Sequence, residues 1–438
     1  MKTIFLTGSF LMLLCLLTFS LPSCEKEFTN PGAVTESQVL TSADGLVALG
    51  VGIQRRYSIG RQSPVYNRST AAGFTTGELR LINPGNVSEN DLSLGYEDLD
   101  PDNAVVNNLW SQSLLVRNEA QTLLDNLDNV PSATTRAGLQ AYATIFYALA
   151  NETLFLFFEQ APVMTAPDAE FSDRSALLQA NLMLLDEADR ALAANPPTAG
   201  FLSRIPSGID LGNTIKALQA RHNLFLGNYP AAIAAANAVD EDATSVLQFD
   251  DVTPNPIAFV SITTDNVYQP LNLTLGLPDG LRPDTDDQRL AFYFEEVMPA
   301  NDNFRAAGFY GSNGSSIPIY LPGEMDLIRA EAFARQNDLD SAVDALNEVL
   351  TKDPADDPFG IGAGLDEYDG PVTQEAILNA IYTNRATEFQ LSGFRLEDSR
   401  RFDRPGPNAD NPERNRTFYP YPNSERDNNV NTPPNPTI

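Results

Sequence analysis

Two segments far apart in the chain share one pattern, and this pattern limits the possible folds more than any other feature of the sequence. Residues 215–239 (IKALQARHNLFLGNYPAAIAAANAV) and 325–350 (MDLIRAEAFARQNDLDSAVDALNEVL) each contain an Ala- and Arg-bearing helical stretch, a short polar turn and a second Ala-rich stretch. Small side chains at the expected crossing points would let two antiparallel helices approach closely; these are Ala220, Ala232, Ala332 and Ala342. Such a unit is typical of tetratricopeptide-like repeats, which bury a shared face by stacking. Ordinary hairpins in an all-α domain are the alternative.

Helical spacing of apolar residues extends to much of the remaining chain. A helix is expected to begin at Ser42, and longer helices are expected within residues 103–127, 137–159 and 175–195. The sequence therefore predicts a mainly α fold built on a tetratricopeptide-like helical-repeat scaffold.

Two stretches lack this periodicity. Residues 58–103 are rich in Gly, Asn, Asp and Pro, so we expect mainly loops there. Residues 245–320 are interrupted by Pro, Asp and Gly and contain short β-like pieces at 257–263 (IAFVSIT) and 316–321 (SIPIYL). Irregular segments of this kind are where variable recognition is usually located.

The N-terminus has the layout of a secretory signal peptide. Lys2 precedes an apolar stretch over residues 4–21, which small and polar residues interrupt. A transmembrane helix is the alternative, because the stretch approaches the ~20 residues that span a bilayer. No basic stop-transfer cluster follows the stretch, which favours the signal peptide.

The apolar stretch ends in LPSC (residues 21–24), which resembles a bacterial lipobox, in which the cysteine becomes the first mature residue and carries diacylglycerol. A chance cysteine near a signal cleavage site is the alternative. Cys15 would be removed with the signal peptide, so lipidation of Cys24 would leave no free thiol in the mature chain. We expect residues 1–23 to be a lipoprotein signal peptide, 24–41 a lipidated tether and 42–438 a single α-rich domain.

The strongly negative net charge of the chain limits the kinds of molecule that it can bind. The chain has 58 Asp and Glu residues against 28 Lys and Arg, a net charge of −30 that becomes −31 if Lys2 is removed. Such a surface repels nucleic-acid phosphates and anionic lipid head groups, so membrane attachment would have to be covalent, through Cys24. High acidity with scarce Lys favours adaptation to salty surroundings, where self-repulsion is screened. A lineage bias in composition is the alternative.

Residue types that common catalytic and metal sites require are scarce. His222 is the only histidine, so the sequence offers neither a Ser–His–Asp or Cys–His system nor a zinc site, and we interpret His222 as a packed or surface residue. Residues 98–103 (DLDPDN) and 283–289 (PDTDDQR) match a calcium loop only in part, so we interpret both as loops. The sequence predicts no catalytic residue, no metal and no cofactor.

The C-terminal part of the sequence carries the motif most specific to one family. Residues 376–402 (AILNAIYTNRATEFQLSGFRLEDSRRF) and 416–429 (RTFYPYPNSERDNN) resemble the signature helix and closing stretch of the SusD/RagB family of outer-membrane nutrient-binding lipoproteins. The positions that match the family pattern are Ile381, Arg385, Glu388, Phe389, Gly393, Arg395, Asp398 and Arg401. Asn384 and Ser392 stand where the family usually has glutamates, which predicts fewer ion pairs there.

The resemblance implies helix pairs as a scaffold, with irregular loops and short strands on one face that carry the binding surface. It also implies a non-enzymatic lipoprotein, anchored in the outer membrane and facing the exterior. Such a protein binds a nutrient, here expected to be an oligosaccharide, and delivers it to a SusC-like TonB-dependent β-barrel transporter. A tetratricopeptide-type adaptor that binds only protein and a secreted glycosidase with a carboxylate pair are the alternatives.

Aromatic side chains in the expected loops are the candidate ligand-binding residues, because sugar rings stack on aromatic faces while polar groups bond their hydroxyls. They are Tyr66, Phe74, Tyr96, Tyr268, Phe309 and Tyr310. Local packing of each ring is the alternative, and Trp110 is interpreted as a core residue.

The charged motif residues are interpreted as structural rather than ligand-binding. Arg385 and Glu388, like Arg395 and Asp398, have the i+3 spacing that allows pairing within one helix. Gly393 is expected to interrupt the helix.

Overall fold

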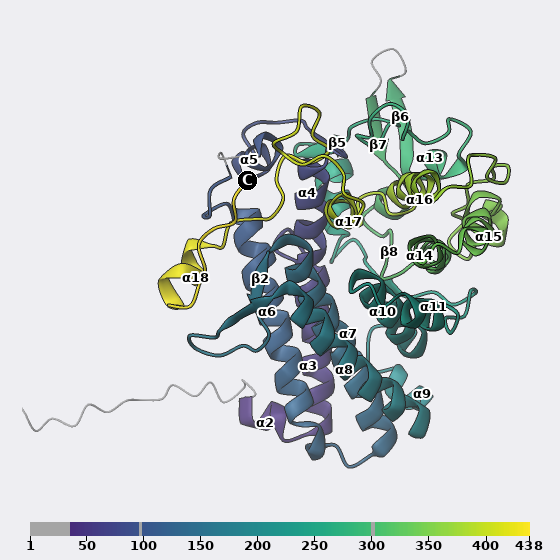
Figure 1. The fold of residues 1–438 in the computed structure, drawn as a ribbon. Helices are drawn as coiled ribbons and strands as arrows, with labels where there is room; N and C mark the ends of the chain where they lie inside the picture. Colours follow the sequence, from purple (N-terminus) through teal and green to yellow (C-terminus); the bar gives the residue numbers. More distant parts are fainter. Residues whose placement is uncertain (1–35, 96–98, 299–302) are drawn as a thin grey trace, which may run out of the picture.

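The computed structural model describes residues 36–95, 99–298 and 303–438. Helices dominate this part of the chain and the strands are short (Figure 1). The predicted mainly α fold is therefore confirmed. Within the same ranges no helix is both long and apolar enough to cross a membrane. Cys24 and the predicted signal peptide lie outside the described residues.

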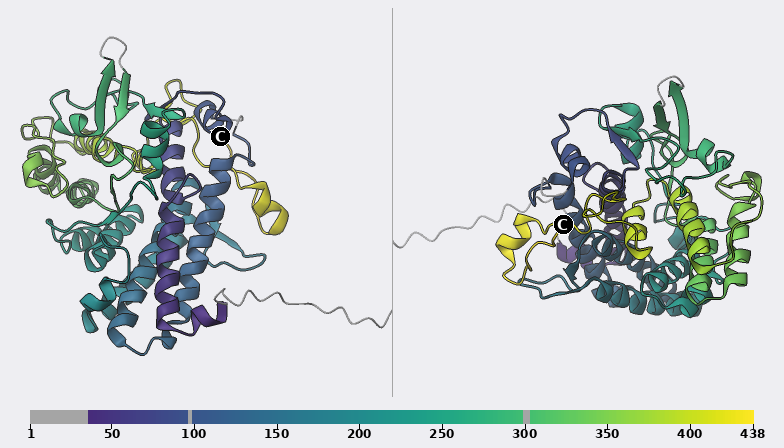
Figure 2. Two further views of the ribbon diagram at one scale, coloured as in Figure 1. Left: turned by 180° about the vertical axis from the view of Figure 1, so that it is seen from behind. Right: turned by 45° about the horizontal axis from the view of Figure 1, so that its top comes forward.

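A group of long helices from the N-terminal half packs side by side, and Figure 2 shows it from behind. The group contains α3 (Ala43–Ser58), α6 (Ala104–Asp125), α7 (Ala133–Phe157) and α8 (Arg174–Ala194), preceded by the short α2 (Glu36–Leu40). Polar caps start two of them: Ser42 Oγ accepts a hydrogen bond from the Gly45 amide before α3, and Asn103 does the same for Val105 before α6. α7 is buried over most of its length and forms the centre of this group.

Both predicted hairpins are present. α10 (Leu211–Phe225) and α11 (Tyr229–Ala236) form the first, α14 (Pro322–Arg335) and α15 (Leu339–Leu350) form the second, and α11 packs against α14. Each turn contains a left-handed residue, Gly227 with φ +75° and Asn337 with φ +62°. The small residues predicted at the crossings are fully buried, as expected: Ala220, Ala232, Ala332 and Ala342. α16 (Gln374–Glu388) packs against α14 and α15.

Most of the short elements lie in the upper part of the view in Figure 1. The antiparallel strand pairs are β1 (Leu79–Leu81) with β5 (Tyr268–Pro270), β2 (Gln160–Pro162) with β3 (Phe171–Asp173), β4 (Val246–Leu247) with β8 (Ile317–Pro318), and β6 (Phe294–Met298) with β7 (Asn303–Ala306). Among these segments lie α5 (Val87–Leu94), α12 (Pro256–Ala258), α13 (Gln288–Tyr293) and the turn η5 (Gly308–Tyr310). The β1–β5 pair joins the two stretches that lack periodicity, since one strand comes from each.

Some predictions for the irregular stretches were wrong. Residues 58–103 are not mainly loops, because α4 (Pro64–Thr75) and α5 lie there. α4 is buried on every side, so it has no polar face that would give its sequence a helical period. Residues 257–263 are not a strand but α12 and the π-helix η3 (Phe259–Thr263). The end of the predicted tether forms α2.

Candidate functional site

The motif near the C-terminus folds as two helices joined by a tight turn. α16 ends at Glu388, α17 (Arg395–Arg401) follows, and residues 389–394 between them form what we call the motif turn. Leu391 has φ +57° and Gly393 has φ +91°, both in the left-handed region. A Cβ atom on Gly393 would lie 3.0 Å from Arg68 Nε, so the turn needs glycine there for conformation and for space. The predicted helix interruption at Gly393 is confirmed.

The motif charges pair between helices, which corrects the expected i+3 pairs. Arg385 of α16 donates two hydrogen bonds of 3.0 Å to Asp398 of α17. Glu388 accepts a hydrogen bond of 3.1 Å from Arg289 of α13. The reason is the motif turn, which brings α17 back beside α16 and turns Glu388 toward α13. These pairs are almost completely buried, as expected of structural residues.

Arg395 makes no ion pair with any residue that the structure describes. Its side chain is 3% exposed, its three nitrogens have no hydrogen-bond partner among the described residues, and its guanidinium lies 4.7 Å from the Tyr382 ring centroid. Arg395 interacts electrostatically with the buried Glu78, whose pKa burial raises to about 7 despite the opposing effect of Arg395.

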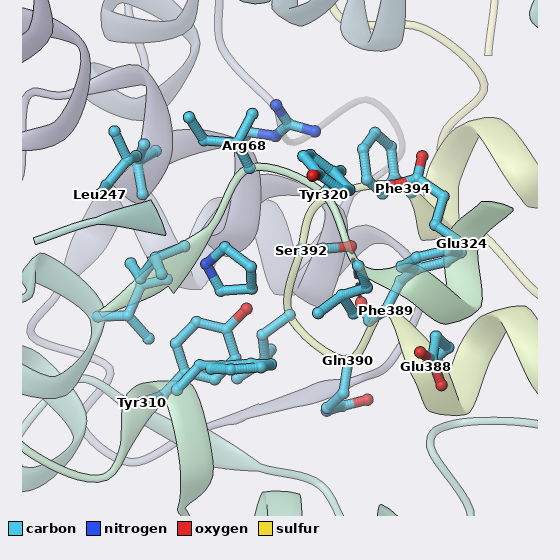
Figure 3. Close-up of a pocket in the computed structure, with 18 of the residues that line it drawn as sticks. Arg68, Leu247, Tyr310, Tyr320, Glu324, Glu388, Phe389, Gln390, Ser392 and Phe394 are labelled. Atoms are coloured by element: carbon cyan, nitrogen blue, oxygen red, sulfur yellow. Dashed lines mark hydrogen bonds between the residues drawn. The ribbon is translucent and has the colours of Figure 1, made fainter. Parts of the chain in front are cut away.

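A partly open pocket lies beside the motif turn, where the long helices, the repeat helices and the irregular segment meet (Figure 3). Its empty volume is about 630 Å³ including the mouth, and about 60 Å³ of this can hold the centres of water-sized molecules. The motif turn forms one wall. Apolar and aromatic side chains from other elements form much of the rest, among them Val65, Leu149, Leu247, Ile257, Phe309 and Tyr310.

A chain of buried ion pairs runs along the pocket. Arg68 Nη1 lies 3.1 Å from Glu152 Oε1, and Arg221 Nη1 lies 3.1 Å from Glu152 Oε2. Arg221 Nη2 in turn lies 2.7 Å from Glu324 Oε2. Both guanidinium groups stack on Phe394 of the motif turn, at 4.7 and 4.6 Å from its ring centroid. The two cations and two anions of this wall therefore balance.

His222 belongs to the same buried network, which confirms the interpretation that it is a packed residue. Its Nε2 atom lies 3.1 Å from Glu152 Oε2. Burial alone would raise the pKa of Glu152, but Arg221, the hydrogen bond from His222 and Arg68 lower it well below its usual value. Glu152 therefore stays ionised and holds the network together.

A second hollow is a larger open groove, lined by parts of residues 283–287 and 364–369 and by α16, in which about 660 Å³ can hold the centres of water-sized molecules. Its charged lining residues are all acidic: Asp284, Asp286, Asp287, Asp366, Glu367 and Asp369. Asn384 lines the groove, and its Oδ1 atom accepts a 2.6 Å hydrogen bond from Arg289. Nowhere in the described part of the chain do three or more His, Cys, Asp or Glu residues form a group that could hold a metal ion.

No family model and no curated protein matches this chain. Solved structures do match it. A SusD superfamily protein from Bacteroides fragilis is 18% identical, with a TM-score of 0.63 over 90% of this chain and 99% of that chain. A SusD-like carbohydrate binding protein from Bacteroides vulgatus is 14% identical, with a TM-score of 0.65 over 83% of this chain and 84% of that one.

The fold of this chain is that of the SusD superfamily. A laminarin binding SusD-like protein has it too, at 16% identity and a TM-score of 0.62 over 90% of this chain and 99% of that one. The fold expected from the motif is therefore confirmed.

Within this SusD-like fold, the five described aromatic candidates are buried. Tyr268 stacks on Tyr66 at 6.2 Å between ring centroids and meets Phe74 edge-on at 5.9 Å, so these three rings pack on one another. Phe309 and Tyr310 line the pocket instead. Tyr96 lies outside the described residues, and its role stays a prediction.

Trp110 is a core residue of the SusD-like fold, as expected. Its ring lies 4.8 Å from that of Phe158 and 5.8 Å from that of Tyr421, and its Nε1 atom donates a 2.9 Å hydrogen bond to Glu425. The closing FYPYP stretch thus packs against the first long helices.

Sequence reasoning missed the residue that is chemically most unusual in the pocket. Gln390 is 2% exposed and lines the pocket, and neither its amide nitrogen nor its amide oxygen has a hydrogen-bond partner in the described part of the chain. Its place inside the family motif was visible in the sequence, but nothing local indicated that its side chain would be buried without a partner.

Proposed function

We propose that this chain is a non-catalytic, surface-exposed lipoprotein that binds an oligosaccharide and delivers it to a SusC-like TonB-dependent β-barrel. The observation that carries the proposal is the SusD-like fold, shared over most of the chain with proteins described as carbohydrate binding and laminarin binding. The motif turn and its buried ion pairs stabilise this fold, and the hollows beside it are available to a ligand.

The two hollows differ in what they offer to a sugar. The groove has the volume typical of ligand sites, roughly 300–1,000 Å³, and its carboxylates are strong acceptors for hydroxyl groups. The pocket is smaller and mostly apolar, so it takes a side group rather than a whole ring. The all-acidic charges of the groove disfavour polyanionic glycans.

A glycan screen of the purified full-length chain tests the proposal. We expect binding of at least one oligosaccharide, measured by calorimetry, with no change in the sugar after prolonged incubation. Hydrolysis of the bound sugar would favour the glycosidase alternative. Failure to bind any glycan, together with capture of a protein partner, would favour the adaptor.

The membrane anchor is tested separately. Cys24→Ala should abolish incorporation of labelled palmitate and release the chain from the membrane, because an acidic surface does not bind lipid unaided. A variant that stayed membrane-bound would favour an uncleaved helix. Co-purification of a β-barrel transporter with the wild-type chain would support the proposed partner.

A further inference from the structure

Gln390 lines the pocket with both polar atoms of its side chain unpaired; Arg68 Nε is the other buried side-chain atom of the lining without a hydrogen-bond partner among the described residues. A buried amide without a hydrogen-bond partner is costly, and such groups are usually satisfied by water or by a ligand. Gln390 offers a donor and an acceptor side by side, and both are unpaired in the described part of the chain. The complementary group is another amide, whose carbonyl accepts from the NH₂ group while its N–H donates to the oxygen.

The size of the pocket limits what can enter. About 60 Å³ can hold the centres of water-sized molecules, and one water needs roughly 10–15 Å³ by this measure. The pocket therefore holds roughly four to six waters, or a group of a similar number of non-hydrogen atoms. A pyranose ring is too large for this space, whereas an acetamido group fits it.

The pocket wall favours a neutral group with an apolar end. Ile257, Tyr310 and Phe389 supply surfaces against which a methyl group can pack. The charges of Arg68 and Arg221 are already balanced by carboxylates, so a charged occupant would find no free counter-ion there. An acetamido group has both features, a methyl end and a neutral amide.

We propose that the pocket beside the motif turn binds the acetamido group of an N-acetylated hexosamine, with Gln390 as the residue that recognises it. The inference rests on the proposed glycan-binding function and names its substrate class: oligosaccharides that contain N-acetylhexosamine. The sugar ring remains at the mouth of the pocket, and only its acetamido group enters.

Two matched ligands test the proposal on the wild-type full-length chain. The β-1,4 tetramers of N-acetylglucosamine and of glucose share a backbone and differ at C2, where the first carries an acetamido group and the second a hydroxyl. Calorimetry should show at least about ten-fold tighter binding of the acetylated tetramer. Equal affinity for the two, or binding only of glycans without acetamido groups, would overturn this inference and leave the proposed function intact. Binding of no glycan would overturn both.

A third ligand separates amide recognition from charge. The tetramer of glucosamine lacks the acetyl groups and is cationic, so a purely electrostatic surface of this acidity would bind it best. We expect it to bind no better than the glucose tetramer at physiological salt. Tight, salt-sensitive binding of glucosamine would replace the acetamido proposal with a charge-based one.

Gln390→Leu tests the recognising residue. It keeps a side chain of similar size and removes both amide atoms, so it should reduce the affinity for the acetylated tetramer to that for the glucose tetramer. Gln179→Leu, on the exposed side of α8, is the matched control and should keep the preference. An unchanged preference in Gln390→Leu would overturn the role of Gln390. If this variant did not fold, the three-ligand comparison on the wild type would still decide the substrate class.

Discussion

Arg289 Nη1 lies 3.1 Å from Glu388 Oε2, and both side chains are almost completely buried. The same guanidinium bonds Asp287 at 2.7 Å and Asn384 at 2.6 Å. Asp287 and Asn384 line the groove, and Glu388 lines the pocket. The Arg289 side chain therefore links α13 to α16 between the two hollows. Asn384 supplies a neutral amide oxygen, so the carboxylate partners of Arg289 are Asp287 and Glu388.

Arg289→Met should destabilise the protein strongly. The change leaves Asp287 and Glu388 buried without their cation, and breaking a buried pair in this way typically costs about 3–5 kcal/mol. Urea unfolding followed by circular dichroism measures the loss.

Arg282→Ala is the matched control for this variant. Arg282 pairs with Asp279 at 2.5 Å, but both side chains are more than half exposed. An exposed pair contributes at most about 1 kcal/mol. Similar losses for the two variants would show that the Arg289 network does not stabilise the fold more than a surface pair does.

Gly393→Ala should also destabilise the protein, because alanine disfavours this backbone conformation and because its Cβ atom would press on a neighbouring side chain. Gly280→Ala separates the two effects. Gly393 has φ +91°, and an added Cβ would lie about as close to Arg68 Nε as any Cβ contact allows, at 3.0 Å. Gly280 has φ +89° and no atom within 4 Å of the added Cβ. Gly280→Ala therefore measures the cost of placing alanine in the left-handed conformation alone, roughly 1–2 kcal/mol of unfolding free energy. The loss for Gly393→Ala should be larger. Equal changes in the free energy of unfolding would rule out steric contact as the additional reason.

The helical part of this fold could be predicted because its signal is local. The hairpins at 215–239 and 325–350, the long helices and the break at Gly393 all follow from apolar spacing, small residues and a turn residue. α4 could not be predicted in this way. Arg68, Ser69 and Thr70 are polar yet buried, because they meet partners from distant parts of the chain: Glu152 for Arg68, the Leu391 carbonyl for Ser69 and Tyr268 for Thr70.

The candidate site was harder to predict for the same reason. The pocket assembles residues from α4, α10, α14 and the motif turn, which lie far apart in the sequence. Tyr66 and Tyr268 are aromatic residues of expected loops, but Tyr66 lies in the buried helix α4, Tyr268 lies in β5, and the two buried rings stack on each other. Gln390 carries no sequence signal of its own, since an unpaired amide is a property of its surroundings.

Glu78→Gln should change how stability depends on pH. Burial raises the pKa of Glu78 from 4.5 to about 7 in the folded state. A carboxyl whose folded-state pKa is raised favours the folded state in its protonated form, so its stabilising effect is full below pH 4.5 and is lost as the pH rises to about 7. The wild type should therefore lose up to roughly 3 kcal/mol from this group between pH 4.5 and 7.5, and Glu78→Gln should remove that loss.

Unfolding free energies at pH 5 and pH 8 measure this difference. Glu375→Gln, at an exposed position in the first turn of α16, controls for the change in net charge. If Glu78→Gln had the same pH dependence as the wild type, Glu78 would not be the titrating group.

Added salt should stabilise this protein. Among the described residues, the exposed basic side chains are Arg55, Arg56, Arg61, Arg190, Arg204 and Arg282, and exposed carboxylates outnumber them several-fold. Other arginines, such as Arg221, are buried in ion pairs that salt screens only weakly. Raising NaCl from about 0.1 to 1 M, where the Debye length falls from about 10 to 3 Å, should therefore relieve repulsion at the surface without weakening the interior, and raise Tm by several degrees.

The salt effect has an internal control in the acidic groove. Asp284→Asn combined with Asp366→Asn removes two exposed carboxylates from the groove lining without touching a buried pair. The double variant should have a higher Tm than the wild type in 0.1 M NaCl, and the two values should converge in 1 M NaCl because the repulsion that the variant removes is then already screened. A Tm that fell with salt in the wild type, or a difference between the two proteins that did not shrink, would show that surface repulsion is not what limits the stability of this chain.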